Sequence, residues 1–404
     1  MKNFLKAFIY LIPWFLSTQS YAQIEYSNVN LKYLYDLDCE VVFDHISYIT
    51  ENNASLFLKL KLAEDKSYYK VTYETKNSYL EKEFIRRDSL SLETSLMNSD
   101  GKNHYLKTTI PNVSEPTLIV FKVYSIKTST PYYFDVLLDP SSKMNNSGLL
   151  LMHADQNVPL FSNYISTADT FRMANLASTG NEVFAYHYGS GFQAGDPPMV
   201  TRKSATNQSL KVDSIYQWQT GVKYNLEPGL FFAQSDTNSL QGFSFRVVDT
   251  YYPKYVTLND LVDPLTYITT RKEKGALDKA RENKSAFDKF WLEMTGSSER
   301  ARRIIGQYYT RIADANRLFT SYKSGWKTDQ GMIYSIFGPP DEVYRTGSHE
   351  DWIYAANSNQ AAQRFTFNRF NNIFTLQHYV LERQEKYRND WYWAVNQWRK
   401  GRRR

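Results

Sequence analysis

The sequence predicts a multidomain fold with a β-rich N-terminal part, two β-sandwich-like domains, followed by a C-terminal α+β domain. Apolar, β-branched and aromatic segments separated by turn residues fill the first part of the chain. Helical periodicity replaces them after about residue 255. With 404 residues, the chain is also longer than one ordinary hydrophobic core supports.

Aromatic residues are unusually frequent, because 32 Tyr, 24 Phe and 8 Trp make up 16% of the chain. Tyr suits a strand, since its ring packs on the pleated surface while its hydroxyl stays in water. The same residues are favoured at binding surfaces. We expect most of them to pack sheets and a minority to serve recognition.

The first residues have the pattern of a secretory signal peptide. Lys2 and Lys6 precede a short apolar run at 7–15, and Ser-Tyr-Ala at 20–22 matches a cleavage site of small residues. The run is shorter than the ~20 apolar residues that a permanent membrane helix needs. The sequence therefore predicts export, with cleavage after Ala22.

Changes in composition predict the domain boundaries. These are a signal peptide at 1–22, a β-sandwich-like domain at 23–140, a second β-rich domain at 141–254, an α+β domain at 255–400 and a basic tail at 401–404. A polar, proline-containing stretch at 139–143 marks the boundary between the two β-rich domains. One larger β domain in place of the two sandwiches is an alternative.

The expected strands are apolar segments bounded by Asn, Asp, Gly and Pro. The clearest in the first domain lie at 41–43, 55–62, 68–73 and 117–126. The clearest in the second lie at 148–152, 182–188, 229–233 and 242–248. Cys39, the only cysteine, adjoins the first of these segments and is expected to be a buried core thiol.

Helices dominate the start of the third domain. A charged segment at 272–294 carries an apolar stripe at i, i+3, i+4 and i+7, formed by Phe287, Phe290, Trp291 and Met294. Ser297 suits the N-cap of a second helix that keeps helical spacing as far as Phe319. A last helix is predicted where Trp391, Ala394, Val395 and Trp398 repeat the same spacing.

The segment after the second helix resembles the signature of the GWxTD domain family. It reads Gly-Trp-Lys-Thr-Asp at 325–329, continues through an apolar run to Gly-Pro-Pro-Asp at 338–341, and is followed by Trp-Ile-Tyr at 352–354. The resemblance covers roughly residues 255–400. It implies an exported envelope protein of a Gram-negative bacterium, and it supplies no established catalytic residues. The motif residues expected to have a structural or binding role are Gly325, Trp326, Thr328, Asp329, Gly338, Pro339, Pro340, Asp341, Trp352 and Tyr354.

The first motif is expected to form a locked turn. Gly325 and Gly331 permit backbone angles that are closed to other residues, and Trp326 is expected to anchor the loop in the core. Thr328 and Asp329 are expected to accept hydrogen bonds from neighbouring backbone N–H groups.

A short apolar strand is predicted at 332–337, after the turn, with Gly338 at its end. Pro339 and Pro340 fix the next backbone angles, and Asp341 and Glu342 are expected in the first turn of a short helix. Three further strands are predicted, at 352–354, 364–367 and 374–377.

The sharpest catalytic candidates are the carboxylates Asp329, Asp341, Glu342, Glu350 and Asp351. Paired carboxylates serve as acid and base in glycoside hydrolysis, and nearby Trp and Tyr rings stack on sugars. Each of the five also lies near Gly, Pro or Ser, where turn capping explains Asp329 and Asp341 and solvation explains the others. We therefore predict no catalytic residues.

Other chemistry finds no support in the sequence. The six histidines are scattered singly, without the spacing of a zinc site, so neither a metal nor a cofactor is predicted. One cysteine excludes an internal disulfide. The sequence also lacks a GxSxG motif and a Gly-rich phosphate loop.

The net charge of +6 is concentrated at the two ends of the chain. Without Lys2, Lys6 and the five cations among residues 399–404, the body has a charge of about −1. No nucleic-acid partner is therefore expected. The basic tail is either a solvated end or a contact for anionic lipid, lipopolysaccharide or an acidic partner.

These observations predict a non-enzymatic envelope protein in the periplasm or associated with the outer membrane. We expect it to be an interaction or assembly subunit of a larger secretion or outer-membrane assembly complex, with envelope proteins as partners. A carbohydrate-binding or carbohydrate-hydrolysing protein is one alternative. A structural surface protein is another.

Overall fold

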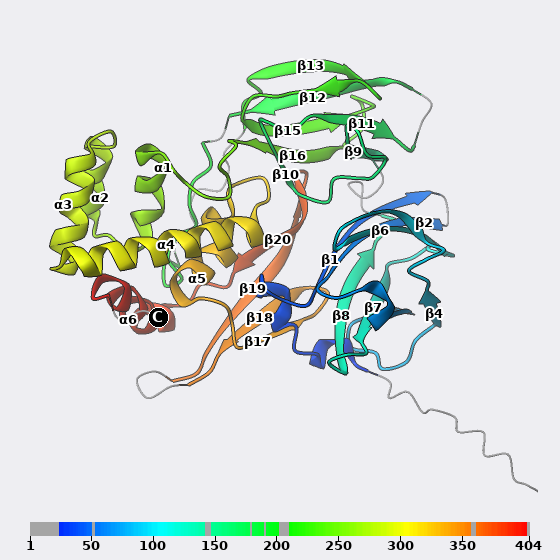
Figure 1. The fold of residues 1–404 in the computed structure, drawn as a ribbon, viewed down its shortest axis with the longest axis horizontal. Coiled ribbons are helices and arrows are strands. Elements are labelled where there is room, and N and C mark those ends of the chain that lie inside the picture. The colour runs from blue at the N-terminus through cyan, green and yellow to red at the C-terminus, as the bar shows by residue number, and fades with distance from the viewer. Residues whose placement is uncertain are drawn as a thin grey trace, which may run out of the picture.

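The computed structural model describes residues 24–50, 53–141, 147–177, 180–189, 191–201, 210–356 and 361–401. Its N-terminal part is β-rich, with several antiparallel sheets, and its C-terminal part combines helices with a small sheet, which confirms the predicted fold class (Figure 1). The predicted signal peptide, and the predicted tail except for Gly401, lie outside the described residues. Within those residues, no helix has the length and apolar character required to cross a membrane.

The first sandwich consists of two four-stranded sheets. One has the order β1 (Val41–Thr50), β2 (Asn53–Leu62), β6 (Asn103–Pro111) and β5 (Leu96–Asp100). The other has the order β4 (Arg86–Leu90), β3 (Tyr69–Lys76), β7 (Thr117–Ser125) and β8 (Thr130–Leu138). Leu56, Leu58 and Leu60 alternate along β2 and are fully buried between the sheets. This period of two is what places one face of the strand in the core.

The second sandwich pairs a five-stranded sheet with a three-stranded one. The first has the order β10 (Tyr164–Ser166), β16 (Phe243–Val248), β15 (Gly229–Gln234), β12 (Glu182–Tyr188) and β13 (Ser214–Gln219). The second has the order β14 (Lys223–Tyr224), β11 (Phe171–Asn175) and β9 (Leu149–His153). Aromatic rings fill the space between the sheets, with Phe231 and Phe245 stacked at 5.5 Å and Trp218 beside them.

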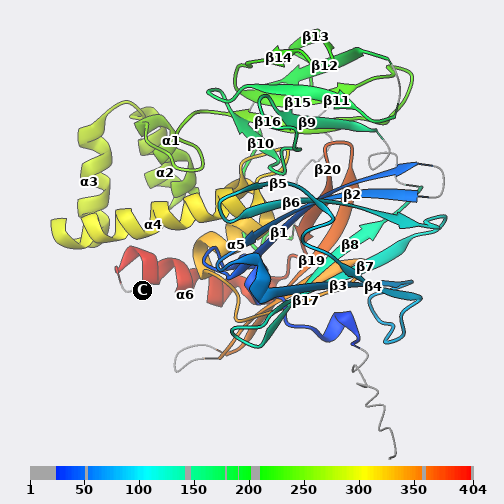
Figure 2. The same cartoon turned by 45° about the vertical axis from the view of Figure 1, so that its right-hand side comes forward.

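The C-terminal part holds the described α-helices and a four-stranded sheet. The helices are α1 (Leu258–Val262), α2 (Arg271–Lys279), α3 (Lys284–Thr295), α4 (Ser298–Phe319), α5 (Asp329–Phe337) and α6 (Arg388–Arg399). The sheet has the order β17 (Glu342–Arg345), β18 (His349–Tyr354), β19 (Gln363–Asn372) and β20 (Thr375–Leu381). The β19–β20 hairpin rises between the helices and the first sandwich toward the second sandwich in both views (Figures 1 and 2).

Short 3₁₀ helices connect these elements, at η1 (Tyr26–Asn28), η2 (Lys32–Tyr35), η3 (Lys66–Tyr68), η5 (Asp263–Tyr267), η6 (Gly325–Lys327) and η7 (Glu385–Tyr387).

The single helix predicted over 272–294 is wrong, because the chain forms α2 and α3 there. Thr270 and Glu273 make a capping box at the start of α2, and the Asn283 side chain accepts the Ala286 N–H at 3.1 Å to start α3. A residue whose side chain caps a new N-terminus ends the helical continuity before it. The helix with Ser297 as N-cap and the last helix are confirmed as α4 and α6.

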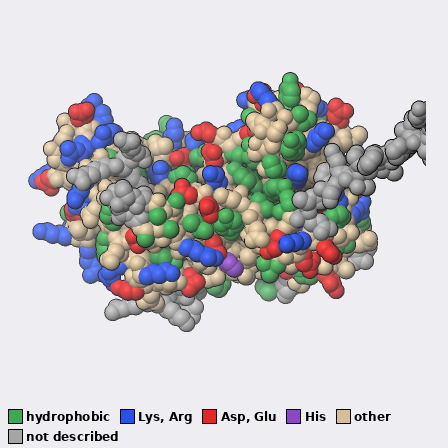
Figure 3. All heavy atoms as spheres, turned by 90° about the horizontal axis from the view of Figure 1, so that it is seen from below, with side chains coloured by type: hydrophobic (Ala, Val, Ile, Leu, Met, Phe, Trp, Pro, Cys, Tyr) green, Lys and Arg blue, Asp and Glu red, His purple; other side chains and the backbone are tan. Residues whose placement is uncertain are grey.

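Two residues depart from what their sequence context indicates. Cys39 is only partly buried, so the prediction of a core thiol is wrong; it lies outside the sandwich, just before β1. Arg399, counted with the basic end of the chain, forms an ion pair with Glu273 at 2.8 Å. On the face in Figure 3, acidic and basic side chains are mixed, and Lys and Arg gather at the end that carries the helices.

The N-terminal segment before β1 packs into the core of the C-terminal part. Tyr26, Leu31 and Tyr35 are buried in the same cluster as α4 and α5. The Leu31 N–H donates to the Val343 carbonyl at 2.8 Å, and the Val343 N–H donates to the Asn30 side chain at 3.0 Å. This segment therefore covers the outer edge of β17.

A buried charge cluster joins the first sandwich to the C-terminal sheet. The Arg345 guanidinium on β17 lies 2.7 Å from Asp135 on β8 and 2.6 Å from Glu350 on β18. The hydroxyls of Tyr26 and Tyr79 donate to Asp135 at 3.0 and 2.8 Å. Burial by itself raises the pKa of Asp135, but Arg345 and these hydroxyls outweigh it and hold the pKa below its usual value.

Replacing Asp135 with alanine is expected to lower the stability of the protein by about 3–5 kcal/mol, because it leaves the buried Arg345 with one carboxylate in place of two. The shift would be measured by urea denaturation. The matched control is Glu64→Ala, which breaks an exposed ion pair with Lys127 and is expected to cost less than about 1 kcal/mol. Equal denaturation midpoints for the two variants would contradict this assignment.

Candidate functional site

The Gly-Trp-Lys-Thr-Asp motif packs directly on the C-terminal half of α4. At Gly325, an added Cβ would lie 2.0 Å from the Ala315 carbonyl oxygen, and at Gly331 it would lie 1.9 Å from the Gly325 carbonyl oxygen. Neither glycine has a positive φ angle. The prediction that these glycines are needed for their backbone angles is therefore wrong. They are needed because two backbone segments approach too closely to leave room for a side chain.

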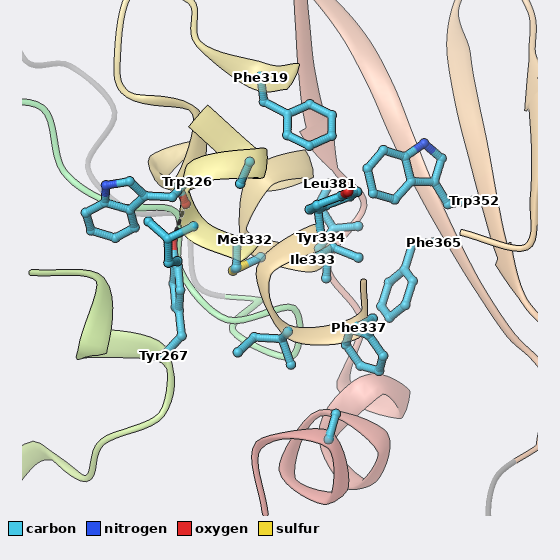
Figure 4. Close-up of a cluster of buried hydrophobic side chains, with 14 of the residues drawn as sticks. Tyr267, Phe319, Trp326, Met332, Ile333, Tyr334, Phe337, Trp352, Phe365 and Leu381 are labelled. Carbon is cyan, nitrogen blue, oxygen red and sulfur yellow. Dashed lines mark hydrogen bonds between the residues drawn. The ribbon is translucent and has the colours of Figure 1, made fainter. Parts of the chain in front are cut away.

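Trp326 fixes this loop in the core through its side chain and both of its backbone groups. Its indole N–H donates to the Tyr255 hydroxyl at 2.9 Å, and its backbone N–H donates to the Asn316 side chain at 3.2 Å. Its carbonyl accepts the Tyr267 hydroxyl at 3.2 Å (Figure 4). A buried tryptophan needs such a partner for its N–H.

The adjacent residues Thr328 and Asp329 have different structural roles. The Thr328 hydroxyl accepts the Gly331 N–H at 2.9 Å and donates to the Gly325 carbonyl at 2.7 Å, so it is the N-cap of α5. Asp329 does not bond to a neighbouring backbone group as predicted. Its carboxylate accepts the Leu381 N–H at 2.8 Å and both terminal nitrogens of Arg383, at 2.9 and 2.6 Å. It therefore ties α5 to the end of β20.

Residues 332–337 belong to α5, and the strand predicted there is wrong. All nine residues of α5 are buried. Such a helix has no polar face, so its sequence shows no helical period and is indistinguishable from a buried strand. Phe319, Trp352 and Phe365 surround it (Figure 4).

The Gly-Pro-Pro-Asp segment is a turn from α5 into β17. Gly338 follows the helix at a φ of 93°, and its carbonyl accepts the Tyr354 hydroxyl at 2.8 Å. The predicted short helix at Asp341 and Glu342 is wrong. The Asp341 N–H donates to the Ile353 carbonyl and its carboxylate accepts the Ala355 N–H at 2.7 Å, which starts the β17–β18 pairing. Pro339 is exposed and Pro340 is buried between them.

Other candidate carboxylates are also held by protein groups. Glu350 and Asp351 are buried, so the prediction that they are solvated is wrong. Glu350 accepts a hydrogen bond from the Trp352 indole N–H at 2.6 Å and forms an ion pair with Arg345. Asp351 accepts the Thr366 hydroxyl at 2.6 Å and pairs with Arg364. These contacts account for both carboxylates as structural groups.

A cavity of about 420 Å³ lies where the two sandwiches and the C-terminal part meet. Its walls come from all three, including β1 (residues 43–48), β8 (Phe134 and Asp135), the second sandwich (Leu150, Phe161 and Phe243), the motif region (Phe319, Ser321, Thr328 and Gln330) and β20 (His378 and Tyr379). Only Thr328 of the predicted motif residues reaches it. Sequence reasoning missed the rest, because they come from segments far apart in the chain with no shared pattern.

A model of the GWxTD domain family matches residues 229–400. The chain carries a GWxTD domain. No curated protein matches the sequence. A solved C-terminal 282-residue fragment of intimin, in complex with the intimin-binding domain of the translocated intimin receptor, is similar at 8% identity over 86% of this chain and 95% of that one. Its TM-score of 0.16 is too low to carry an argument.

The matched GWxTD domain begins earlier than residue 255, since it includes β15 and β16 of the second sandwich. These strands contact the motif region. Arg246 on β16 donates to the Tyr322 carbonyl at 2.9 Å, and Phe232 on β15 packs against Phe374, in the turn just before β20. The family match therefore follows a set of packed elements.

Two neutral imidazoles line the cavity beside the GWxTD domain. Burial lowers the pKa of His45 to about 4; Asp135 opposes the shift, and Arg345 and Arg369 add to it. Burial lowers the pKa of His378 to about 4 as well, with Lys323 adding and Asp329 opposing. Neither ring has a hydrogen-bond partner within the described parts of the chain. Those parts also contain no group of three His, Cys, Asp or Glu residues placed to hold a metal.

Gly325→Ala is expected to destabilise the protein by about 1–3 kcal/mol, since the new methyl group overlaps the backbone of α4. Gly306→Ala is the matched control. Gly306 lies on α4 with nothing within 4 Å of an added Cβ, and alanine there is expected to stabilise by about 0.5–1 kcal/mol. Thermal unfolding of both variants tests the pair; the same sign of change in both would refute the explanation.

The melting temperature is expected to fall between pH 7 and pH 5. Both imidazoles have folded pKa values of about 4, below the ordinary 6.5, so the unfolded chain takes up protons first as the pH falls. Their stabilising contribution is complete above about pH 6.5 and is lost toward pH 4. The double variant His45→Gln, His378→Gln should show a flatter profile by calorimetry. A profile as steep as that of the parent protein would rule this explanation out.

Proposed function

We propose that this chain is a non-enzymatic protein of the cell envelope that holds another envelope protein within a larger complex. The observation that carries the proposal is how the motif residues are used. The polar groups of Trp326, Thr328 and Asp329 form caps, ion pairs and hydrogen bonds inside the fold, and the exposed Asp341 carboxylate accepts the Ala355 N–H. Because these polar groups bond within the protein, the motif acts as a structural scaffold. The surfaces that it positions can then contact a partner.

The proposal places the protein in the periplasm or at the outer membrane, as a subunit of a secretion or outer-membrane assembly machine. The signal-peptide pattern at residues 1–22 and the GWxTD domain support this placement. An arrangement of several β-rich units around one cavity is also consistent with binding another polypeptide.

The contacts of its candidate residues weigh against a carbohydrate-acting enzyme. A retaining or inverting glycosidase needs two carboxyl groups that both reach the sugar. Asp329 is buried and bound to Arg383, while Asp341 caps the end of β18. Trp326, whose ring would have to stack on the sugar in such a site, is buried as well. A purely structural surface protein is the other alternative, and surface labelling of intact cells separates it from the proposal.

Cross-linking of the mature protein in intact cells, followed by mass spectrometry, is expected to recover a defined envelope complex. Gly306→Ala should recover the same complex, because it leaves the motif intact. Gly325→Ala should recover less of it, in proportion to the protein that remains folded, because it displaces the motif from α4. Recovery of only abundant, scattered neighbours by the parent protein would sink the proposal and make purified peptidoglycan and polysaccharides the next ligands to test.

A further inference from the structure

Among the strands that the structure describes, β1 has a neighbour along one edge only, because it is the terminal strand of the sheet β1-β2-β6-β5. The Ala63 N–H donates to the Glu40 carbonyl at 2.9 Å, which marks residue 40 as a hydrogen-bonded position opposite β2. Such positions recur at every second residue, so the N–H and C=O groups of Phe43, His45 and Ser47 point to the outer edge. Nothing in the described residues hydrogen-bonds to these backbone groups.

This free edge faces the cavity. Six consecutive residues of β1, 43–48, line it. Successive side chains of a strand point to opposite faces, so a cavity that touches six residues in a row lies against the edge of the strand. On the far side, His378 and Tyr379 come from β20, the terminal strand of the C-terminal sheet.

Features that protect the sheet edges at β5 and β17 are missing from β1. β5, at the opposite edge of the same sheet, has five residues and a register shift between Leu96 and Asn98. β17 is covered by the N-terminal segment through Leu31. β1 has ten residues, an unbroken register with β2 and no proline. Proteins protect edges of this kind against pairing with strands of other molecules. A long, regular edge left open inside a cavity is therefore available to pair with an added strand.

The walls on the two sides of this edge differ in chemistry. On one side, Ile46 packs with Phe161 and Leu150 of the second sandwich. On the other side, His45 lies near the Asp135–Arg345 pair, and its ring adjoins Phe43 at 6.2 Å. A strand placed between these walls would present apolar side chains to one and hydrogen-bonding side chains to the other.

We propose that the outer edge of β1 accepts an extended segment of a partner protein, which adds a strand to the first sandwich inside the cavity. The segment alternates apolar and small polar side chains and pairs with residues 43–47, about 17 Å of strand. Main-chain hydrogen bonds supply affinity, and the two walls supply specificity. This inference rests on the proposed function and names the chemistry of the partner.

The probe is a blocked seven-residue peptide of alternating valine and threonine with a lysine at each end. Binding to the full-length mature protein would be followed by fluorescence anisotropy, and protection of the β1 amides by hydrogen–deuterium exchange. Ser47→Pro removes one outward N–H and leaves the pairing with β2 intact, since proline is tolerated on edge strands. Ser47→Ala is the matched control that keeps this N–H.

The parent protein and Ser47→Ala are expected to bind the peptide equally and to slow exchange at His45 and Ser47. Ser47→Pro should bind about tenfold more weakly, because one hydrogen bond is lost and the next is displaced. The same peptide with alternate amides N-methylated should also lose binding, and this arm needs no protein variant to fold. Equal binding by the methylated peptide would overturn the proposal in favour of a small-molecule pocket, and no binding at millimolar peptide would overturn it outright.

The remaining outcomes separate this inference from the proposed function. A peptide that binds without protecting β1 places the site elsewhere and refutes the inference. Dimerisation of the parent protein that Ser47→Pro abolishes assigns the edge to a second copy of this chain and also refutes it. If cross-linking in cells recovers the same envelope complex from Ser47→Pro as from Ser47→Ala, the proposed function stands and the strand-acceptor site fails.

Discussion

The guanidinium of Arg345 lies between two carboxylates that come from different parts of the chain, Asp135 on β8 and Glu350 on β18. Glu350 is fully buried, and Asp135 and Arg345 are mostly buried, so each charge relies on the others to offset its lost hydration. Tyrosine hydroxyls from the N-terminal segment and from the first sandwich complete the cluster. This contact sets where the first sandwich sits against the C-terminal sheet. Because Asp135 and Arg345 also form part of the cavity wall, it shapes the cavity as well.

The GWxTD motif makes it possible to bury a whole helix, α5, inside the protein. α5 has no exposed face, so the N–H groups at its start must be satisfied inside the protein. Thr328 caps the first turn, and Gly325 lets the preceding loop lie flat on α4. Asp329 then uses its negative charge at the helix N-terminus to hold Arg383 and the end of β20. The motif thus links α4, α5 and the sheet at one point.

These two structural centres leave the cavity as the place where the three parts of the protein meet without filling the space between them. Its walls combine aromatic rings, two neutral imidazoles and the open edge of β1. A neutral imidazole offers one hydrogen-bond donor and one acceptor, and the strand edge supplies donors and acceptors in a fixed row. A polypeptide segment can contact all three kinds of group at once, which is the physical basis of the proposed strand-acceptor site.

The sequence by itself determined the elements whose burial is one-sided. β2, α4 and α6 show their periods of two or 3.6 because one face meets the core and the other is more exposed to water. Capping residues such as Ser297 were also readable, since their bonds are local. The tertiary structure alone decided α5, because burial on every side erases the period that separates a helix from a strand. The tertiary structure alone also decided the partners of Asp329 and Arg345 and the walls of the cavity. These contacts join residues far apart in the chain, so sequence spacing does not predict which of them come together.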